Sequence, residues 1–293
     1  MARGIVVITG VGMKEAQRKF KQPDPAEIVS GHTLGKKAKI NSPAGASIAL
    51  NKDDYIVYMT GDCKHCLEHI GKLFLKGEYH FKEVNLLDKS SVKELVEDIK
   101  RLKKEKNLPV HLVHYGGMSG VASKVTLPKE TVALSPWEVP SEAIGPYVEA
   151  NCASLLNIVQ GMKEIFNKQE ISKVIIISAI SAIRTKRLHT LDAVQKSAVH
   201  AMARSMALDL TKEKIYITEI MPGITDTGFY DDPETFKAMQ LASEELGYKY
   251  TEDNFPVFKP ERVGEAVVFA LDINAQVREL SLIPYGQYPH LGA

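Results

Sequence analysis

The feature that most limits the fold of this chain is a regular alternation of short apolar runs with longer amphipathic stretches. Residues 174–177 form a β-branched run of the kind found in buried strands. In residues 191–210 the apolar and small residues recur at intervals of three and four, which predicts an amphipathic helix. Strands that alternate with helices predict a parallel sheet with helices on both faces. We therefore expect an α/β chain with a doubly wound sheet in a single domain spanning residues 1–293.

The same patterns give the other elements. We expect strands over 5–9, 55–60, 79–84, 110–113, 215–221 and 280–283, and helices over 90–106, 141–168 and 261–271, with another helix beginning near Ala44. A basic stretch at about 13–43 interrupts this order as an insert.

Composition narrows the class of protein. A net charge of +1 gives no reason to expect a nucleic-acid or membrane partner. No run approaches the roughly 20 apolar residues of a membrane-spanning helix. Three cysteines in 293 residues are typical of a reducing compartment, so we expect a cytoplasmic protein.

Residues 172–210 resemble the short-chain dehydrogenase/reductase family, in which this strand ends in a catalytic Ser and the next helix carries Tyr-x-x-x-Lys. The register that puts Lys196 on the family's Lys puts Asp192 at the Tyr position and Ala179 at the Ser position. The resemblance implies a Rossmann-like fold, NAD or NADP as cofactor, a small-molecule substrate and self-association as a dimer or tetramer.

The two replacements change the expected chemistry. In the family the Tyr gives its proton to the substrate oxygen while hydride leaves the nicotinamide. Asp192 beside Lys196 favours an ionised pair instead of a proton donor. The other candidate acids are His189, which precedes Lys196 at the spacing of the enoyl reductase branch, and Tyr115, at the end of a strand. Asn151 matches the family's helix Asn, which belongs to its proton relay.

The resemblance also implies a cofactor site. Glycines after the first strand let the backbone approach a pyrophosphate, and Asp62 stands near the position that contacts the adenosine ribose. Asp62 favours NAD, whereas Lys64 and the basic insert leave NADP open. The expected cofactor-binding residues are Gly10, Gly12, Asp62, Asn85, Gly116, Lys196, Pro222, Gly223, Ile224 and Thr227. A substrate lid is expected at about 224–260.

Cys63 and Cys66 form a Cys-x-x-Cys pair, with His69 one turn later. Such a pair can begin a zinc site or act as a redox couple, but no second pair follows at zinc-finger spacing. We therefore expect no metal site and ordinary packing of both side chains.

Two functions remain open. One is an atypical NAD(P)-dependent oxidoreductase acting on a small carbonyl or acyl-thioester substrate. The other is a catalytically degenerate relative that binds a ligand or partner, or performs non-redox chemistry. Such a relative would need no nicotinamide cofactor.

Overall fold

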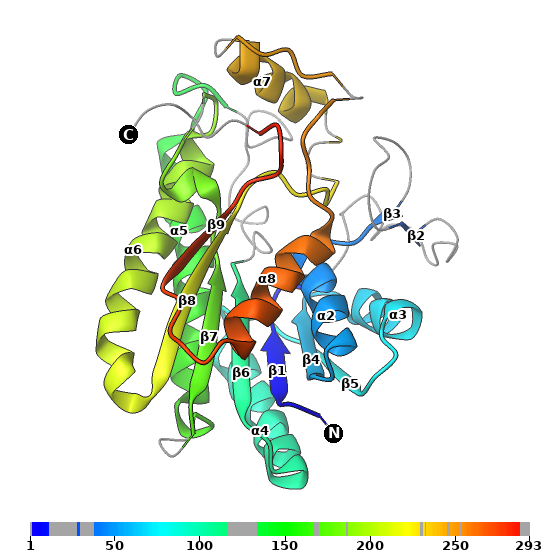
Figure 1. Cartoon of the computed structure of the whole chain (residues 1–293). Helices are drawn as coiled ribbons and strands as arrows, with labels where there is room; N and C mark the ends of the chain where they lie inside the picture. Colours follow the sequence, from blue (N-terminus) through cyan, green and yellow to red (C-terminus); the bar gives the residue numbers. More distant parts are fainter. Residues whose placement is uncertain are drawn as a thin grey trace.

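The computed structural model describes residues 2–11, 28–29, 38–116, 134–166, 170–185, 187–228, 231, 233–244, 247–251 and 254–287. At its centre lies a seven-stranded sheet with the order β5-β4-β1-β6-β7-β8-β9, and every neighbouring pair is parallel (Figure 1). The strands are β1 (Ile5–Ile8), β4 (Ile56–Gly61), β5 (Tyr79–Glu83), β6 (Val110–Tyr115), β7 (Ser172–Ile177), β8 (Ile215–Pro222) and β9 (Glu279–Leu282). The Rossmann-like fold class is confirmed.

Helices cover both faces of this sheet because its strands are apolar on both sides. On one face lie α2 (Ser42–Lys52), α3 (Lys64–Phe74) and α8 (Pro260–Asp272). On the other lie α4 (Lys89–Lys106), α5 (Ser141–Gly161) and α6 (Thr190–Leu210). Within β6, Val113 and Tyr115 join the first core and Leu112 joins the second, so successive side chains alternate between the two faces.

Two glycines set how closely α2 and α8 pack. A Cβ on Gly45 would lie 2.4 Å from the backbone carbonyl carbon of Pro260, and one on Gly264 would lie 2.7 Å from Ala49 Cβ. Only hydrogen fits at these two positions, which explains the small-residue run in α2.

The predicted helix 141–168 is shorter than expected. α5 ends at Gly161 and continues as a 3₁₀ turn over Met162–Glu164, a common way for a helix to tighten at its carboxyl end. Helix α7 (Pro233–Glu244) lies in the expected lid region, above the carboxyl ends of the strands in Figure 1. Among the described helices, none is long and apolar enough to span a membrane.

Part of the predicted insert is ordered against the fold. Strands β2 (Ile28–Val29) and β3 (Ala38–Lys39) form a small parallel pair, while residues 12–27 and 30–37 lie outside the described structure. The Lys39 side chain is 2% exposed and forms ion pairs with Asp226 (2.6 Å) and Asp231 (2.9 Å). The end of the insert is therefore fastened to the loop that follows β8.

Candidate active site

A polar cluster forms where β7 leads into α6, at the carboxyl edge of the sheet. After β7 the chain makes a 3₁₀ turn over Ile180–Ala182, with Ala179 as its N-cap. This turn places the hydroxyl of Ser181, and not residue 179, against the first turn of α6. Ser181 Oγ donates a hydrogen bond to Asp192 Oδ2 at 2.6 Å. A carboxylate therefore stands at the family's Tyr position, and the hydroxyl bonded to it lies two residues beyond the family's Ser position.

Two amides extend this cluster into the interior. Gln195 Nε2 donates to Asp192 Oδ1 (3.3 Å), and Asn151 Nδ2 donates to Gln195 Oε1 (2.7 Å) and to the Tyr147 carbonyl (3.0 Å). Asn151 Oδ1 is buried without a hydrogen-bond partner among the described residues. We call Ser181, Asp192, Gln195, Asn151 and Lys196 the polar cluster.

Lys196 supplies the positive charge of the polar cluster. It lies one helical turn after Asp192 and is half-buried. Burial lowers the pKa of the Lys196 ammonium, against the opposing effect of the acidic groups Asp192 and Cys152. A lysine with a lowered pKa can exchange its proton nearer to neutral pH than an exposed one.

A neutral histidine lies beneath the cluster. The His114 ring is bound at Nδ1 by Thr9 Oγ1 (3.1 Å) and approached at Nε2 by Ser154 Oγ (3.5 Å). Burial, reinforced by the positive charge of Lys196, lowers the pKa of His114 to about 3. His114 is therefore uncharged at neutral pH and adds no second cation beside Lys196.

The helix that carries the cluster is anchored by a second buried network. Glu219 on β8 accepts a hydrogen bond from Ser178 Oγ after β7 and binds His200 Nδ1 on α6 at 2.6 Å. Because one buried carboxylate joins three elements, α6 keeps its rotation relative to the sheet.

The other two predicted acids are oriented by contacts of their own. His189 Nδ1 lies 2.7 Å from the Arg187 carbonyl, and the residue is 2% exposed. The Tyr115 ring belongs to the core on the α2 side of the sheet, where its hydroxyl donates to the Ser42 carbonyl (3.4 Å). Burial raises the pKa of Tyr115. Tyr115 thus faces away from His114 and the polar cluster, whereas the His189 ring is oriented by the Arg187 carbonyl.

Three glycines shape the strand ends where the cofactor is expected. Gly10 has φ +75°, a Cβ on Gly61 would lie 2.1 Å from the Val11 carbonyl oxygen, and one on Gly116 would lie 2.2 Å from Asn151 Oδ1. At the ends of β1, β4 and β6 the backbone therefore adopts a left-handed conformation or packs closely against its own neighbours, and neither situation favours a larger side chain. Gly12 lies outside the described residues.

The α2 N-terminus differs from the family's phosphate loop. Asn41 caps the helix by accepting from Ala44 N (3.1 Å), and its Nδ2 donates to the Gly10 carbonyl (2.7 Å). Pro43 has no N–H to offer. Ser42 Oγ is buried with no partner among the described residues, so it is a donor still available at the place where a phosphate would approach. The left-handed backbone at Gly10 and this hydroxyl fit the phosphates of a nicotinamide nucleotide.

The loop after β8 is held by a residue far along the chain. Gln287 Oε1 accepts from Ile224 N (2.8 Å), and a Cβ on Gly223 would lie 2.2 Å from the same oxygen. Pro222 ends β8, and Thr227 N donates to the Thr225 carbonyl (2.9 Å). These contacts fix the expected nicotinamide loop.

At the other end of the sheet, Asp62 and Asn85 follow β4 and β5, and both are exposed. Asn85 Oδ1 accepts from Leu87 N (3.0 Å), which shapes its turn. Both residues lie at the carboxyl edge, as the cofactor prediction requires.

Comparisons with known proteins agree with this architecture. An alcohol dehydrogenase from the archaeon Thermococcus sibiricus, solved with 5-hydroxy-NADP, superposes with TM-score 0.67 at 16% identity over 98% of each chain. An NADPH-bound short-chain oxidoreductase from Pseudomonas aeruginosa, described as containing an atypical catalytic center, superposes with TM-score 0.68 at 14% identity over 98% of this chain and 97% of the other. An uncharacterized oxidoreductase of Staphylococcus saprophyticus is 23% identical over 89% of this chain and 97% of its own. A family model described as enoyl-(acyl carrier protein) reductase matches residues 55–277. The chain belongs to the short-chain dehydrogenase/reductase family.

The register of the short-chain dehydrogenase/reductase family alone does not identify every residue that meets the polar cluster or the loop after β8. Ser181 was missed because the 3₁₀ turn moves the nearest hydroxyl two residues beyond Ala179. The Ser-x-x-Ser spacing of Ser178 and Ser181 was the available signal. Gln195 and Gln287 gave none, because single glutamines carry no spacing pattern.

Proposed function

We propose that this protein is an NAD(P)-dependent oxidoreductase in which Ser181, Asp192 and Lys196 together replace the family's Ser-Tyr-Lys chemistry. The hydrogen bond between Ser181 Oγ and Asp192 Oδ2 carries the proposal. Its substrates are small alcohols and carbonyls, including acyl thioesters, and the cytoplasm is the proposed location.

The direction of the Ser181 hydrogen bond defines the route of the proton. Because Ser181 gives its own proton to Asp192, its lone pairs are left to accept from a substrate hydroxyl. In alcohol oxidation the proton passes from the substrate to Ser181 and from Ser181 to Asp192. In carbonyl reduction the same groups return it to the substrate oxygen.

The protonation state of Lys196 sets the pH range in which this relay can take up or release a proton. Lys196, whose pKa burial lowers, exchanges the relayed proton with Asp192: it takes the proton from Asp192 in oxidation and gives it back in reduction. The nicotinamide, when bound, supplies or takes the hydride.

The cofactor would be held by residues of this chain along the carboxyl edge. Ser42 Oγ and the backbone at Gly10 would meet the phosphates. Asp62 stands nearest the adenosine ribose, and the loop from Pro222 to Thr227 meets the nicotinamide. We place Lys196 beside the second ribose, as the resemblance implies.

A second candidate function rests on the α2 N-terminus. The Ala44 N–H donates to the Asn41 side chain, and the Gly45 N–H donates to the Asn41 carbonyl (3.1 Å). Pro43 has no backbone N–H. Three of the first four helical residues therefore offer no free donor to a phosphate. A relative that has given up its nucleotide and uses the pocket for another ligand would show this arrangement.

Turnover measured by nicotinamide absorbance tests the first candidate. Small aldehydes, ketones and acyl-coenzyme A thioesters are offered with NADPH and NADH, and alcohols with the oxidised forms. Ser181→Ala should lower kcat by about 10²–10⁴-fold, the usual share of positioned proton transfer. Asp192→Asn should lower kcat and also move the pH profile of kcat/KM to lower pH, because Asp192 holds the pKa of Lys196 up.

Two exposed residues farther along α6 supply matched controls. Ser205→Ala and Asp209→Asn make the same chemical changes outside the polar cluster and should keep wild-type rates. Wild-type kinetics in both Ser181→Ala and Asp192→Asn would show that the relay runs through other residues.

A further inference from the structure

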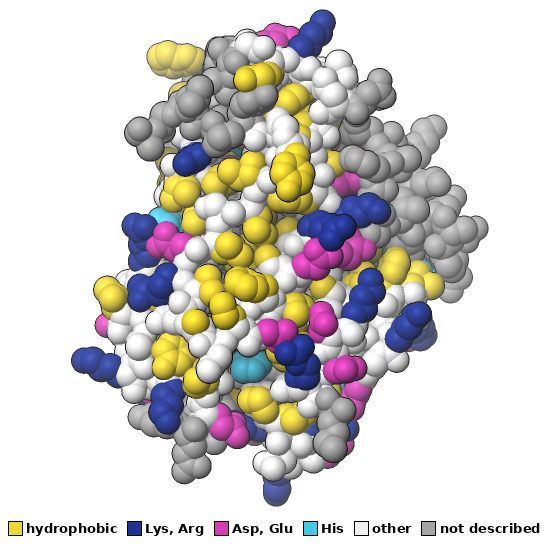
Figure 2. Space-filling view, viewed as in Figure 1, with side chains coloured by type: hydrophobic (Ala, Val, Ile, Leu, Met, Phe, Trp, Pro, Cys, Tyr) yellow, Lys and Arg dark blue, Asp and Glu magenta, His cyan; other side chains and the backbone are white. Residues whose placement is uncertain are grey.

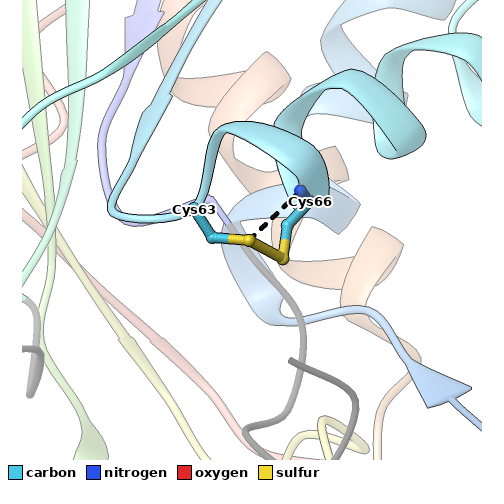
Figure 3. The surroundings of a disulfide bond; sticks show 2 residues. All are labelled: Cys63 and Cys66. Carbon is cyan, nitrogen blue, oxygen red and sulfur yellow. Dashed lines mark hydrogen bonds between the residues drawn. A yellow bond between two sulfur atoms is a disulfide. The ribbon is translucent and has the colours of Figure 1, made fainter. Parts of the chain in front are cut away.

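Cys63 and Cys66 are joined by a disulfide at the start of α3, directly after β4 and Asp62 (Figure 3). Both side chains do pack against the core, as expected, but the expectation of ordinary packing does not include a bond between the two sulfurs. A pair separated by three positions closes a very small loop, which restricts the unfolded chain far less than a bridge between distant segments would. Stabilising the fold is thus a weak explanation for this bridge.

The two sulfurs differ in accessibility. Cys66 is 4% exposed and belongs to the core between α3 and the sheet, whereas Cys63 is half-buried at its margin. An external thiolate can therefore reach Cys63 much more easily than Cys66. Attack at one sulfur and release of the other is the asymmetry that thiol–disulfide exchange requires.

The surroundings of Cys63 favour a thiolate there. Cys63 is the N-cap of α3, and Cys66 N donates to its Sγ at 3.2 Å, as the dashed line in Figure 3 shows. The first turn contains no acidic residue and includes Lys64. A helix N-terminus and a neighbouring cation both stabilise negative charge on sulfur.

From this arrangement we propose that Cys63 and Cys66 form a redox-active site that exchanges with an external dithiol, with Cys63 as the exchanging sulfur and Cys66 as the buried resolving sulfur. The site is chemically separate from the polar cluster and does not depend on it.

The exchange balances in two steps. A thiolate of the dithiol attacks Cys63 Sγ, a new S–S bond forms, and the Cys63–Cys66 bond breaks with its electron pair passing to Cys66 Sγ, which takes a proton from water. The second thiol of the dithiol then attacks its own bound sulfur after losing its proton to water, and Cys63 leaves as a thiolate. The protein disulfide gains two electrons and the dithiol becomes a disulfide.

Alkylation of the reduced full-length chain tests the proposal. After reduction with dithiothreitol and its removal, iodoacetamide labelling is followed at each cysteine by peptide mass spectrometry between pH 5 and 9. Cys63 should titrate well below the ordinary thiol value and react at pH 7 about tenfold faster than Cys152, whose pKa burial raises. A Cys63 that titrates near 8.5 and reacts no faster than Cys152 would overturn the proposal.

A trapping variant gives an independent readout. With Cys66→Ser no resolving sulfur is present, so glutathione disulfide should leave one glutathionyl group on Cys63. The matched variant Cys63→Ser keeps only the buried Cys66 of the pair, which should be modified at least tenfold more slowly than Cys63 in Cys66→Ser. Equal trapping at the two cysteines would contradict the assigned roles. If a variant does not fold, the pH titration of the wild-type chain still decides the question.

Discussion

Replacing Lys39 with methionine should destabilise the protein strongly. The Lys39 side chain is 2% exposed, and its ammonium lies between the carboxylates of Asp226 and Asp231, whose side chains are 9% and 14% exposed. Methionine keeps most of the volume but removes the cation from between two shielded acids. Breaking a buried ion pair from one side costs about 3–5 kcal/mol. For a chain of this size that loss corresponds to a fall in Tm of roughly 5–10 °C.

Urea unfolding followed by circular dichroism at pH 7 measures this loss. Burial alone would lower the pKa of Lys39, but the hydrogen bonds to Asp226 and Asp231 outweigh it, and the pKa is raised. The stabilisation is therefore fully present below the unfolded value of 10.5 and is lost only as pH rises through the folded value. A measurement at pH 7 records all of it.

Lys52→Met on the exposed surface of α2 is the matched control and should change stability by no more than about 0.5 kcal/mol. The double variant Lys39→Met with Asp226→Asn should recover part of the loss, because it removes a buried charge together with its partner. A Lys39→Met protein as stable as the Lys52→Met control would refute the role we assign to this ion pair.

Three further predictions concern the rest of the molecule. Burial, reinforced by Lys173, lowers the pKa of His111 to about 4. The stability that the neutral His111 contributes is therefore complete above pH 6.5 and is lost as pH falls toward 4. In unfolding titrations, His111→Asn should reduce the loss of stability between pH 6.5 and 4.5 by about 2 kcal/mol. Gly45→Ala should lower stability by about 1–3 kcal/mol because the new methyl has no space against Pro260, and an unchanged midpoint in urea would count against the packing of α2 on α8. We expect a dimer or tetramer built through α5 and α6, so Leu208→Asp, at a side chain 68% exposed on α6, should shift the mass seen by light scattering toward the monomer, whereas Ile171→Asp outside these helices should not.

Much of the fold follows from local patterns. The central strands β1, β6 and β7 are expected from their apolar runs, because a strand covered on both faces must be apolar at consecutive positions. Figure 2 shows hydrophobic side chains gathered on one face of the molecule. The exposure of single apolar residues has no comparable sequence signal: Leu208 and Phe269 are exposed on helices that also carry buried apolar residues.

The site was predictable only in outline. The family register located Lys196, Asn151 and Asp192 on the correct helices, and the structure brings these three into one cluster. Ser181 depended on the conformation of a short 3₁₀ turn, which spacing does not specify.

Long-range contacts account for the other omissions. Lys39 meets Asp226 across 187 positions, and the Gln287 amide reaches Ile224 across 63. Neither contact follows from the local sequence of either partner. The disulfide at Cys63 is local, but a Cys-x-x-Cys pair at the start of an amphipathic helix does not by itself specify that the two sulfurs are bonded.

Isothermal titration calorimetry with NADPH and NADH, on the wild-type chain and on Lys196→Met, tests the central claim most directly. An NAD(P)-dependent oxidoreductase should bind at least one of the two with a dissociation constant between about 1 μM and 1 mM. Lys196→Met should weaken that binding at least tenfold, while its unfolding midpoint in urea stays close to that of the wild-type chain. A folded wild-type protein that binds neither nucleotide would contradict the account and favour a relative that has abandoned the cofactor.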